Sequence, residues 1–284
     1  MDDQNLVFII SQPRSGSTFL QSLLSNNPDV NTVSESWLML TMAPLFKPST
    51  IRSSTYDHSM AMDAYKDYCQ KFDLDRVKLI REFAFKHYSP LYSGSSLIID
   101  KTPRYWEILD ELIHIFPRSK FVILKRNPED VIRSMITTWE IRTVEKLAYL
   151  GRDLLEAPNR ISKFANTHST NPNVRNIKYE NLIHDQNLVV AELYKWMNIQ
   201  FEASMLDIKN NDKVQGKYGD PFINGRQKAN LKIDPYFEEL IRGYMFSLDD
   251  TCLKDFGLSR NHYCKTQAFS EFYNHFKTSE NSKK

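Results

Sequence analysis

Glycine is scarce in this sequence, with only 8 among 284 residues. Cysteine is scarcer still, because only Cys69, Cys252 and Cys264 are present, far apart and without metal-ligand spacing. Three isolated cysteines argue against a disulfide framework and favour a reducing compartment. Long apolar runs are also missing: the first, after the acidic start MDDQN, is only LVFII. We therefore predict no signal peptide, no membrane span and a cytoplasmic location.

The chain also lacks an excess of charge of either sign. Its 37 basic and 35 acidic residues leave a formal net charge of +2, too small to indicate a nucleic acid or an anionic membrane as partner. Any basic site must therefore be local. We find no internal repeat, no low-complexity linker and no feature that indicates an oligomeric state. One domain over residues 1–284 is the prediction.

Short apolar runs bounded by turn residues recur along the chain, at residues 6–10, 97–100, 120–125 and 174–179. Helical patterns separate them, at residues 17–25, 105–116, 129–149 and 187–198. This alternation is typical of a parallel sheet covered by helices on both faces. The sequence therefore predicts an α/β fold.

Four segments depart from the alternation. Residues 36–95 are rich in aromatic side chains without a clear strand, which predicts a helical insertion over the carboxyl edge of the sheet. Residues 205–233 are polar and read as a long loop, a kind of segment that is usually functional or disordered. A helix near 234–247 follows, and residues 260–284 form a C-terminal extension that ends in a frayed tail.

The stretch LVFIISQPRSGSTFLQSLL places an arginine, a glycine and three hydroxyl residues between a predicted strand and a predicted helix. The backbone N–H groups that would converge on an anion at the helix N-terminus belong to Ser15, Gly16, Ser17 and Thr18. Against the nucleotide-binding pattern G-x-x-x-x-G-K-[ST], Ser11 replaces the first Gly and Ser17 the Lys, so Arg14 is the only side-chain cation. A serine-rich helix cap without a ligand is the alternative.

A second basic strand end lies in KFVILKRNPEDVIRSM. A nucleoside triphosphatase would place an acidic residue there to hold Mg²⁺, whereas this strand ends with Lys125 and Arg126. These cations favour a second anion, bound without metal. Ser134 lies two helical turns further on and would face the same space. The alternative is a surface pair between Arg126 and Glu129 or Asp130.

Together the two stretches resemble the sulfotransferases that use 3'-phosphoadenosine 5'-phosphosulfate. PRSGST looks like the 5'-phosphosulfate loop of that family, and the spacing of Arg126 and Ser134 matches its 3'-phosphate motif. SESWLML (34–40) and DKTPRYWEIL (100–109) resemble a bacterial branch and, more distantly, tyrosylprotein sulfotransferases. The resemblance covers about residues 5–235. It implies a P-loop-like three-layer fold and transfer of a sulfuryl group to an acceptor hydroxyl or amine.

The resemblance also implies which residues hold the donor. The 5'-phosphosulfate end would be held by Arg14, Ser15, Gly16, Ser17 and Thr18. Arg126 and Ser134 would hold the 3'-phosphate, a task for which the planar guanidinium fork is suited. A sulfuryl group on phosphate carries less charge than a triphosphate, so no metal is expected, and the product would be adenosine 3',5'-bisphosphate.

Sulfuryl transfer needs a base that takes the proton of the acceptor hydroxyl. It also needs cations near the leaving oxygen, where negative charge builds up. Many relatives carry Lys-Thr-His with a histidine base, but this chain reads Lys101-Thr102-Pro103, so that histidine is absent. Lys101 would still cover the bridging oxygen, with Arg14 as a second cation. A pair between Lys101 and Asp100 is the alternative.

Glu35 is the predicted base, because a glutamate in a matching position serves the tyrosylprotein enzymes. Its alternative role is to cap a helix that begins at Trp37. His58 and His87, in the insertion, are weaker candidates. A lone histidine is more often a surface or core residue than a catalytic one.

The segment GKYGDPF (216–222) resembles a glycine-containing segment that closes over the 3'-phosphate in this family. Lys217, Tyr218 and Gly219 are therefore candidate nucleotide contacts, with a simple turn as the alternative. The predicted partner is a small-molecule or carrier-bound acceptor with a hydroxyl group. Two other functions stay open at this point: a degenerate P-loop nucleotide kinase and a non-catalytic nucleotide-binding protein.

Overall fold

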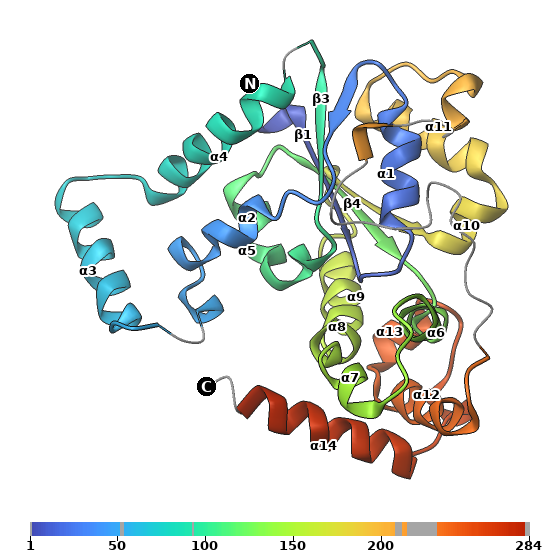
Figure 1. Ribbon diagram of the computed structural model, residues 1–284. Coiled ribbons are helices and arrows are strands. Elements are labelled where there is room, and N and C mark those ends of the chain that lie inside the picture. Colours follow the sequence, from blue (N-terminus) through green and yellow to red (C-terminus); the bar gives the residue numbers. More distant parts are fainter. Residues whose placement is uncertain (1, 52–53, 93, 208–211, 215–231, 282–284) are drawn as a thin grey trace.

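The computed structural model describes residues 2–51, 54–92, 94–207, 212–214 and 232–281 (Figure 1). At its centre lies a sheet of five parallel strands in the order β2-β3-β1-β4-β5. The strands are β1 (Leu6–Ser11), β2 (Val30–Thr32), β3 (Leu97–Lys101), β4 (Lys120–Lys125) and β5 (Val174–Lys178). The predicted α/β fold with a central parallel sheet is confirmed.

The position of the strands follows from their apolar character. Residues 6–10 are fully buried in the central strand, as a sheet covered on both faces requires. In the register of the sheet, Ile9 pairs with Lys101 and Ser11 with Leu124. The carboxyl ends of β1, β3 and β4 therefore lie side by side, at the edge where open α/β sheets bind ligands.

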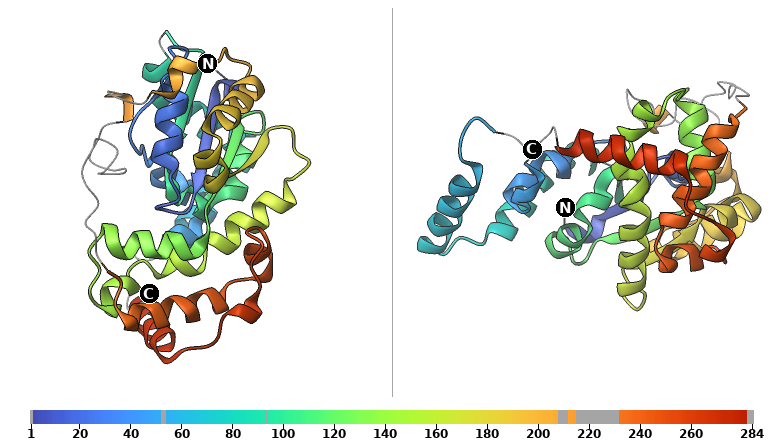
Figure 2. Two further views of the ribbon diagram at one scale, coloured as in Figure 1. Left: turned by 90° about the vertical axis from the view of Figure 1, so that its right-hand side faces the viewer. Right: turned by 90° about the horizontal axis from the view of Figure 1, so that it is seen from below.

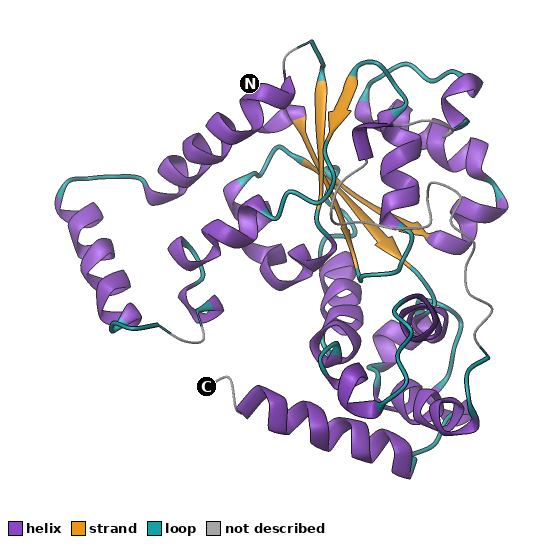
Figure 3. Ribbon diagram, in the orientation of Figure 1, coloured by secondary structure: helices purple, strands orange, loops and turns teal. Residues whose placement is uncertain are grey.

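Helices lie on both sides of the sheet (Figure 3), and alternate residues of β1 belong to two different apolar clusters. Val7 and Ile9 pack in a cluster with α1 (Ser17–Ser25) and α11 (Gln186–Met197). Phe8 and Ile10 pack in a second cluster, on the other face. That cluster takes side chains from α2 (Leu38–Met42), α4 (Arg76–Tyr92), α5 (Leu109–Ile115) and α9 (Ala157–Thr167).

Two predicted helices are shorter than expected. The helix predicted over 129–149 is two helices, α6 (Pro128–Thr138) and α7 (Val144–Ala148). Glu140 between them has φ +49°, and Thr143 caps the second helix. The helix predicted over 105–116 begins as a 3-10 segment, η4 (Pro103–Ile108), and becomes α-helical only at α5. Apolar spacing alone did not reveal either change.

The C-terminal part of the chain forms a third apolar cluster with α6 and α7. Its helices are α8 (Gly151–Leu155), α12 (Pro235–Ser247), α13 (Asp250–Lys254) and α14 (Gln267–Asn281). α14 packs along α7 and α12, at the end of the molecule below the sheet in the left view of Figure 2. The predicted fraying was wrong as far as Asn281, because the helix continues to that residue and anchors itself through Phe272 and Phe276.

The insertion over residues 36–95 contains only helices among its described residues. α4 packs against β2 and β3, and α3 (His58–Lys71) extends away from the sheet (Figures 1 and 2). The two 3-10 turns between α2 and α3 are η2 (Ala43–Leu45) and η3 (Pro48–Thr50). The start of the insertion, at Ser36 and Trp37, is the part that lies next to the end of β3.

Candidate functional site

The PRSGST loop has an unusual backbone. Arg14 and Gly16 both have left-handed conformations, with φ +71° and φ +89°. The N–H of Ser15 donates to the carbonyl of Gln12 at 3.2 Å, so the loop begins with a tight turn. α1 then starts at Ser17 with Gly16 as its cap residue and no side-chain cap. The N–H groups of the first helical turn lack intrahelical acceptors and point, with the helix dipole, at the space in front of the loop.

Gly16 is also required for space. A Cβ at this position would lie 2.3 Å from Cε2 of Tyr179, the first residue of α10 (Tyr179–His184). The Tyr179 ring therefore lies directly against the loop backbone. A side chain at position 16 would therefore force the Tyr179 ring to move.

We predict that Gly16→Ala destabilises the protein by more than its backbone strain alone, which is about 1–2 kcal/mol for a side chain in the left-handed region. Gly257 is the matched control, because it has φ +69° and open space where its Cβ would lie. Urea unfolding should show a larger loss for Gly16→Ala than for Gly257→Ala. In a Tyr179→Ala background that excess should disappear. Equal losses for the two glycines would contradict the clash.

Arg126 joins the end of β4 to this loop. Its Nη1 donates to the carbonyl oxygen of Arg14 at 3.1 Å, and its Cζ lies 4.5 Å from the ring centroid of Tyr179. Its Nε–H is buried and has no acceptor among the described residues. Within the same residues Arg126 forms no ion pair with Glu129 or Asp130, which was the alternative role. A cation with an unsatisfied N–H therefore lies beside the loop.

The Arg14 side chain connects the loop to α6. Its Nε donates to Oγ of Ser134 at 3.4 Å, and its Nη2 donates to Oγ1 of Thr138 at 3.2 Å. The two stretches singled out in the sequence, 112 residues apart, are thus in direct contact through Arg14 and Arg126.

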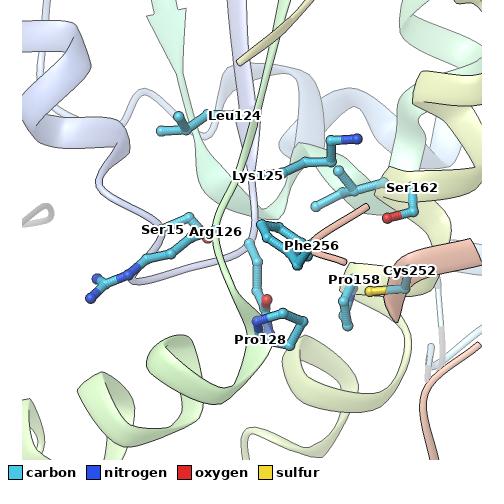
Figure 4. A pocket seen from close by; sticks show the side chains of 11 residues that line it. Ser15, Leu124, Lys125, Arg126, Pro128, Pro158, Ser162, Cys252 and Phe256 are labelled. Carbon is cyan, nitrogen blue, oxygen red and sulfur yellow. The ribbon is translucent and has the colours of Figure 1, made fainter. Parts of the chain in front are cut away.

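Lys125 does not face this space. Its Nζ pairs with Asp255 at 2.8 Å, and the same carboxylate accepts a hydrogen bond from Ser162. Figure 4 shows Lys125 and Arg126 pointing in opposite directions from the strand end. Only Arg126 of the two predicted cations is therefore available to an anion at the loop.

Ser15 also differs from the expectation. Its N–H is used in the turn with Gln12, and its side chain lines the small cavity on the Lys125 side of β4 (Figure 4). Its buried Oγ has no partner among the described residues. Ser15 therefore shapes the loop and does not present an N–H at its front.

A buried ion pair lies behind the loop. Nζ of Lys101, at the end of β3, lies 3.0 Å from Oε1 of Glu35 and 3.4 Å from Oγ1 of Thr18. The Lys101 side chain is fully buried, and that of Glu35 is 13% exposed. Glu35 does not cap α2, whose cap residue is Trp37 and has no side-chain cap bond. The partner of Lys101 is thus Glu35 and not Asp100.

Asp100 has partners of its own. Its carboxylate accepts hydrogen bonds from Tyr88 at 2.5 Å, Tyr105 at 2.8 Å and Ser36 at 2.9 Å. Burial raises the pKa of Asp100 in spite of these bonds and of the neighbouring Lys101. The hydrogen bond from Ser36 to Asp100 fixes the position of Ser36, and therefore that of the neighbouring Glu35.

These residues surround one pocket at the carboxyl edge of the sheet. Of the predicted site residues, its lining includes Arg14, Gly16, Ser17, Thr18, Glu35, Arg126 and Ser134. Lys101 lies behind this wall. The pocket is also lined by residues that the sequence analysis did not single out: Pro13, Phe19, Pro103, Trp139 and Tyr179. A signal for Tyr179 was present, because it is the last residue of the strand predicted over 174–179 and so falls at the same edge.

The remaining candidates lie elsewhere. His58 begins α3, and His87 lines a separate pocket together with Tyr88 and Asp100. Neither histidine lines the pocket of the PRSGST loop. Lys217, Tyr218 and Gly219 lie outside the described residues.

Two features are absent from the described residues. No three His, Cys, Asp or Glu side chains among them are grouped closely enough to hold a metal ion. None of the helices in that part of the chain has both the length and the apolar character to cross a bilayer.

The chain belongs to the sulfotransferase family, whose sequence profile matches residues 6–203. The resemblance seen in the motifs is confirmed. One relative is the nodulation protein NoeE of Sinorhizobium fredii (strain NBRC 101917 / NGR234), 32% identical over 149 residues, which are 50% of this chain and 33% of NoeE. Another is protein-tyrosine sulfotransferase 1 of Danio rerio, which is 23% identical over 228 residues. These residues are 76% of this chain and 59% of the Danio rerio protein. The matches thus span a third and about three fifths of these relatives.

Solved structures share the fold over more of their length. The sulfotransferase domain from the curacin biosynthetic pathway aligns with a TM-score of 0.52 and 22% identity, over 95% of this chain and 96% of its own. The sulfotransferase domain of the Synechococcus PCC 7002 olefin synthase aligns with a TM-score of 0.51 and 18% identity, over 80% of this chain and 85% of its own.

Proposed function

We propose that this chain is a sulfotransferase that moves a sulfuryl group from 3'-phosphoadenosine 5'-phosphosulfate to an acceptor hydroxyl. One observation carries the proposal: the PRSGST loop, Arg126 with Ser134, and the Lys101–Glu35 pair meet around a single pocket. Because the chain belongs to the sulfotransferase family, sulfuryl transfer is the reaction that this geometry supports best.

The pocket fits a donor with two anionic ends. The first turn of α1 offers backbone N–H groups and a favourable dipole to the phosphosulfate end, next to Arg14. Arg126 would meet the 3'-phosphate, because its Nε–H lacks an acceptor among the described residues and Arg14 links its guanidinium to Ser134. The partly buried ring of Tyr179 lines the same pocket and gives the nucleotide a surface to pack against.

The proposed chemistry assigns one role to each member of the buried pair. Glu35 takes the proton of the acceptor hydroxyl as the acceptor oxygen bonds to sulfur. The bond between sulfur and the bridging oxygen breaks, and its electrons stay on the phosphate. Lys101, held beside Thr18, neutralises that charge together with Arg14 and the first turn of α1.

The acceptor would enter along an apolar wall. Phe19, Pro103 and Trp139 line the same pocket, and Trp139 is 43% exposed. Such a wall suits the carbon skeleton of a small-molecule or carrier-bound alcohol. We propose that it orients the hydroxyl group toward Glu35.

The test is to incubate the protein with ³⁵S-labelled donor and a metabolite extract, and to identify the labelled products. We expect transfer to a hydroxyl compound with release of adenosine 3',5'-bisphosphate. Turnover should persist in EDTA, because neither anion-binding stretch contains residues with metal-ligand spacing.

Two outcomes would contradict the proposal. Turnover that stops in EDTA and returns with Mg²⁺, with ATP as the phosphoryl donor, would indicate a degenerate P-loop kinase. Tight binding of the bisphosphate without transfer to any acceptor would indicate a nucleotide-binding protein without catalysis. The Arg126→Ala variant serves as control, because residual label transfer by a contaminating enzyme would not depend on this residue.

A further inference from the structure

The helix α3 has little contact with the rest of its own chain. It extends from the body of the molecule in Figure 1 and in the right view of Figure 2, and its main neighbour is the 3-10 turn η3. Its two buried side chains, Met62 and Cys69, belong to none of the three apolar clusters formed by the described residues. The side chains of α3 therefore add almost nothing to the apolar core of the chain.

An apolar stripe runs along the outer side of α3. Met60, Ala64 and Tyr68 lie on the helix, Tyr56 precedes it and Phe72 is its C-cap residue. The five residues recur at every fourth position and are all exposed. The side chains of Tyr56, Met60, Tyr68 and Phe72 are 54–65% exposed. A spacing of four residues forms a ridge on a helix surface, the feature by which one helix packs into the groove of another.

The outer face of α4 is the matching surface within this chain. Leu79 and Phe83 lie one turn apart and are 40% and 48% exposed. The exposed Lys78 and Lys86 flank them. The exposure of Leu79 and Phe83 shows that no helix of the described part of the chain covers this basic and apolar face.

The charges of the two helical segments are opposite. Residues 57–75 carry five Asp and two Lys, a net charge of −3. Residues 76–92 carry four Lys or Arg and one Glu, a net charge of +3. In one chain the two segments follow each other, and the stripe of α3 stays exposed. In two chains the acidic segment of each meets the basic segment of the other.

We infer that two copies of this chain associate through a reciprocal exchange of their α3 helices. The stripe of α3 in each copy packs on Leu79 and Phe83 of α4 in the other. The contact is made twice around a twofold axis, as closed dimers require. This inference does not depend on the proposed chemistry, because none of these residues lines the catalytic pocket.

The size of the surface is adequate. Six large apolar side chains that are about half exposed would each lose on the order of 100 Å², since a fully buried aromatic residue removes roughly 150–250 Å². Each copy would then bury about 600 Å² of apolar side chain, near the roughly 800 Å² per partner of a standard interface once flanking polar atoms are added.

Charge reversal gives a sharp test by sedimentation velocity. One variant carries Asp63→Lys with Asp67→Lys and so has two basic segments. The other carries Lys78→Glu with Lys86→Glu and so has two acidic segments. We expect the wild-type chain to be dimeric, each variant alone to be monomeric, and an equimolar mixture of the two variants to form dimers again.

The controls separate this contact from loss of folding and from other partners. Circular dichroism should show that both variants keep their helices, although Asp63→Lys removes the pair with Lys66. Tyr68→Ser with Phe72→Ser should weaken the wild-type dimer at least tenfold without any change of charge. A wild-type chain that stays monomeric up to roughly 100 µM, or a variant mixture that stays monomeric, would overturn the inference. So would a monomer whose stripe instead binds phosphatidylcholine–phosphatidylglycerol vesicles.

Discussion

Glu35→Gln should lower kcat by about 10²–10⁴-fold, the usual contribution of a general base. The substitution keeps the shape of the side chain and removes its basicity. The carboxylate lines the pocket of the PRSGST loop, and Lys101 holds it through Oε1. We therefore expect the affinity for adenosine 3',5'-bisphosphate to stay near that of the wild type. Steady-state kinetics and calorimetry on the same preparation measure both quantities.

The control variant is Glu192→Gln, on the exposed side of α11, which should have normal kcat. Glu35→Gln also leaves the buried Lys101 without its carboxylate, and loss of one partner of a buried pair is destabilising by about 3–5 kcal/mol. Kinetics should therefore be measured well below the unfolding transition of the variant. A folded Gln variant with full kcat would end the role of Glu35 as base.

Arg126→Ala should remove most of the preference for adenosine 3',5'-bisphosphate over AMP. A charge-assisted hydrogen bond contributes roughly 1.5–3 kcal/mol, or about tenfold to a hundredfold in affinity. The two nucleotides differ only in the 3'-phosphate, so the ratio of their dissociation constants isolates this contact. Calorimetry with both ligands on wild type and variant gives the ratio directly.

Arg133→Ala is the matched control for Arg126→Ala. Arg133 lies on α6 and uses its guanidinium in ion pairs with Glu129 and Glu238. Its loss should reduce stability and leave the nucleotide ratio unchanged. Equal affinity of the wild-type protein for the two nucleotides would contradict the assignment of a 3'-phosphate site altogether.

The strands were predictable because burial on both faces leaves a strong local signal. All four long strands were found within one residue of their ends. The helices α1, α11 and α12 were found in the same way. The break between α6 and α7 was not, because it depends on a left-handed residue at Glu140 that apolar spacing does not reveal.

The candidate site was predictable in its residues and less so in their partners. The loop, Arg126, Ser134, Lys101 and Glu35 were all named from the sequence, and the structure brings them together. The partner of Lys125 was not foreseeable, because Asp255 lies 130 residues further along the chain. Tyr179 was counted as the last residue of a strand and is instead the first residue of α10.

The bond from Arg126 to the carbonyl of Arg14 has a thermodynamic consequence. The backbone of Arg14 is in a left-handed conformation, and its side chain in turn reaches Ser134 and Thr138. Under the proposed function, the two ends of the donor would thus be bound by groups that hold one another in place. Loss of either end of the ligand would loosen the contacts of the other, and the binding free energies of the two ends would not add. Recognition of the donor would then be cooperative within a single pocket.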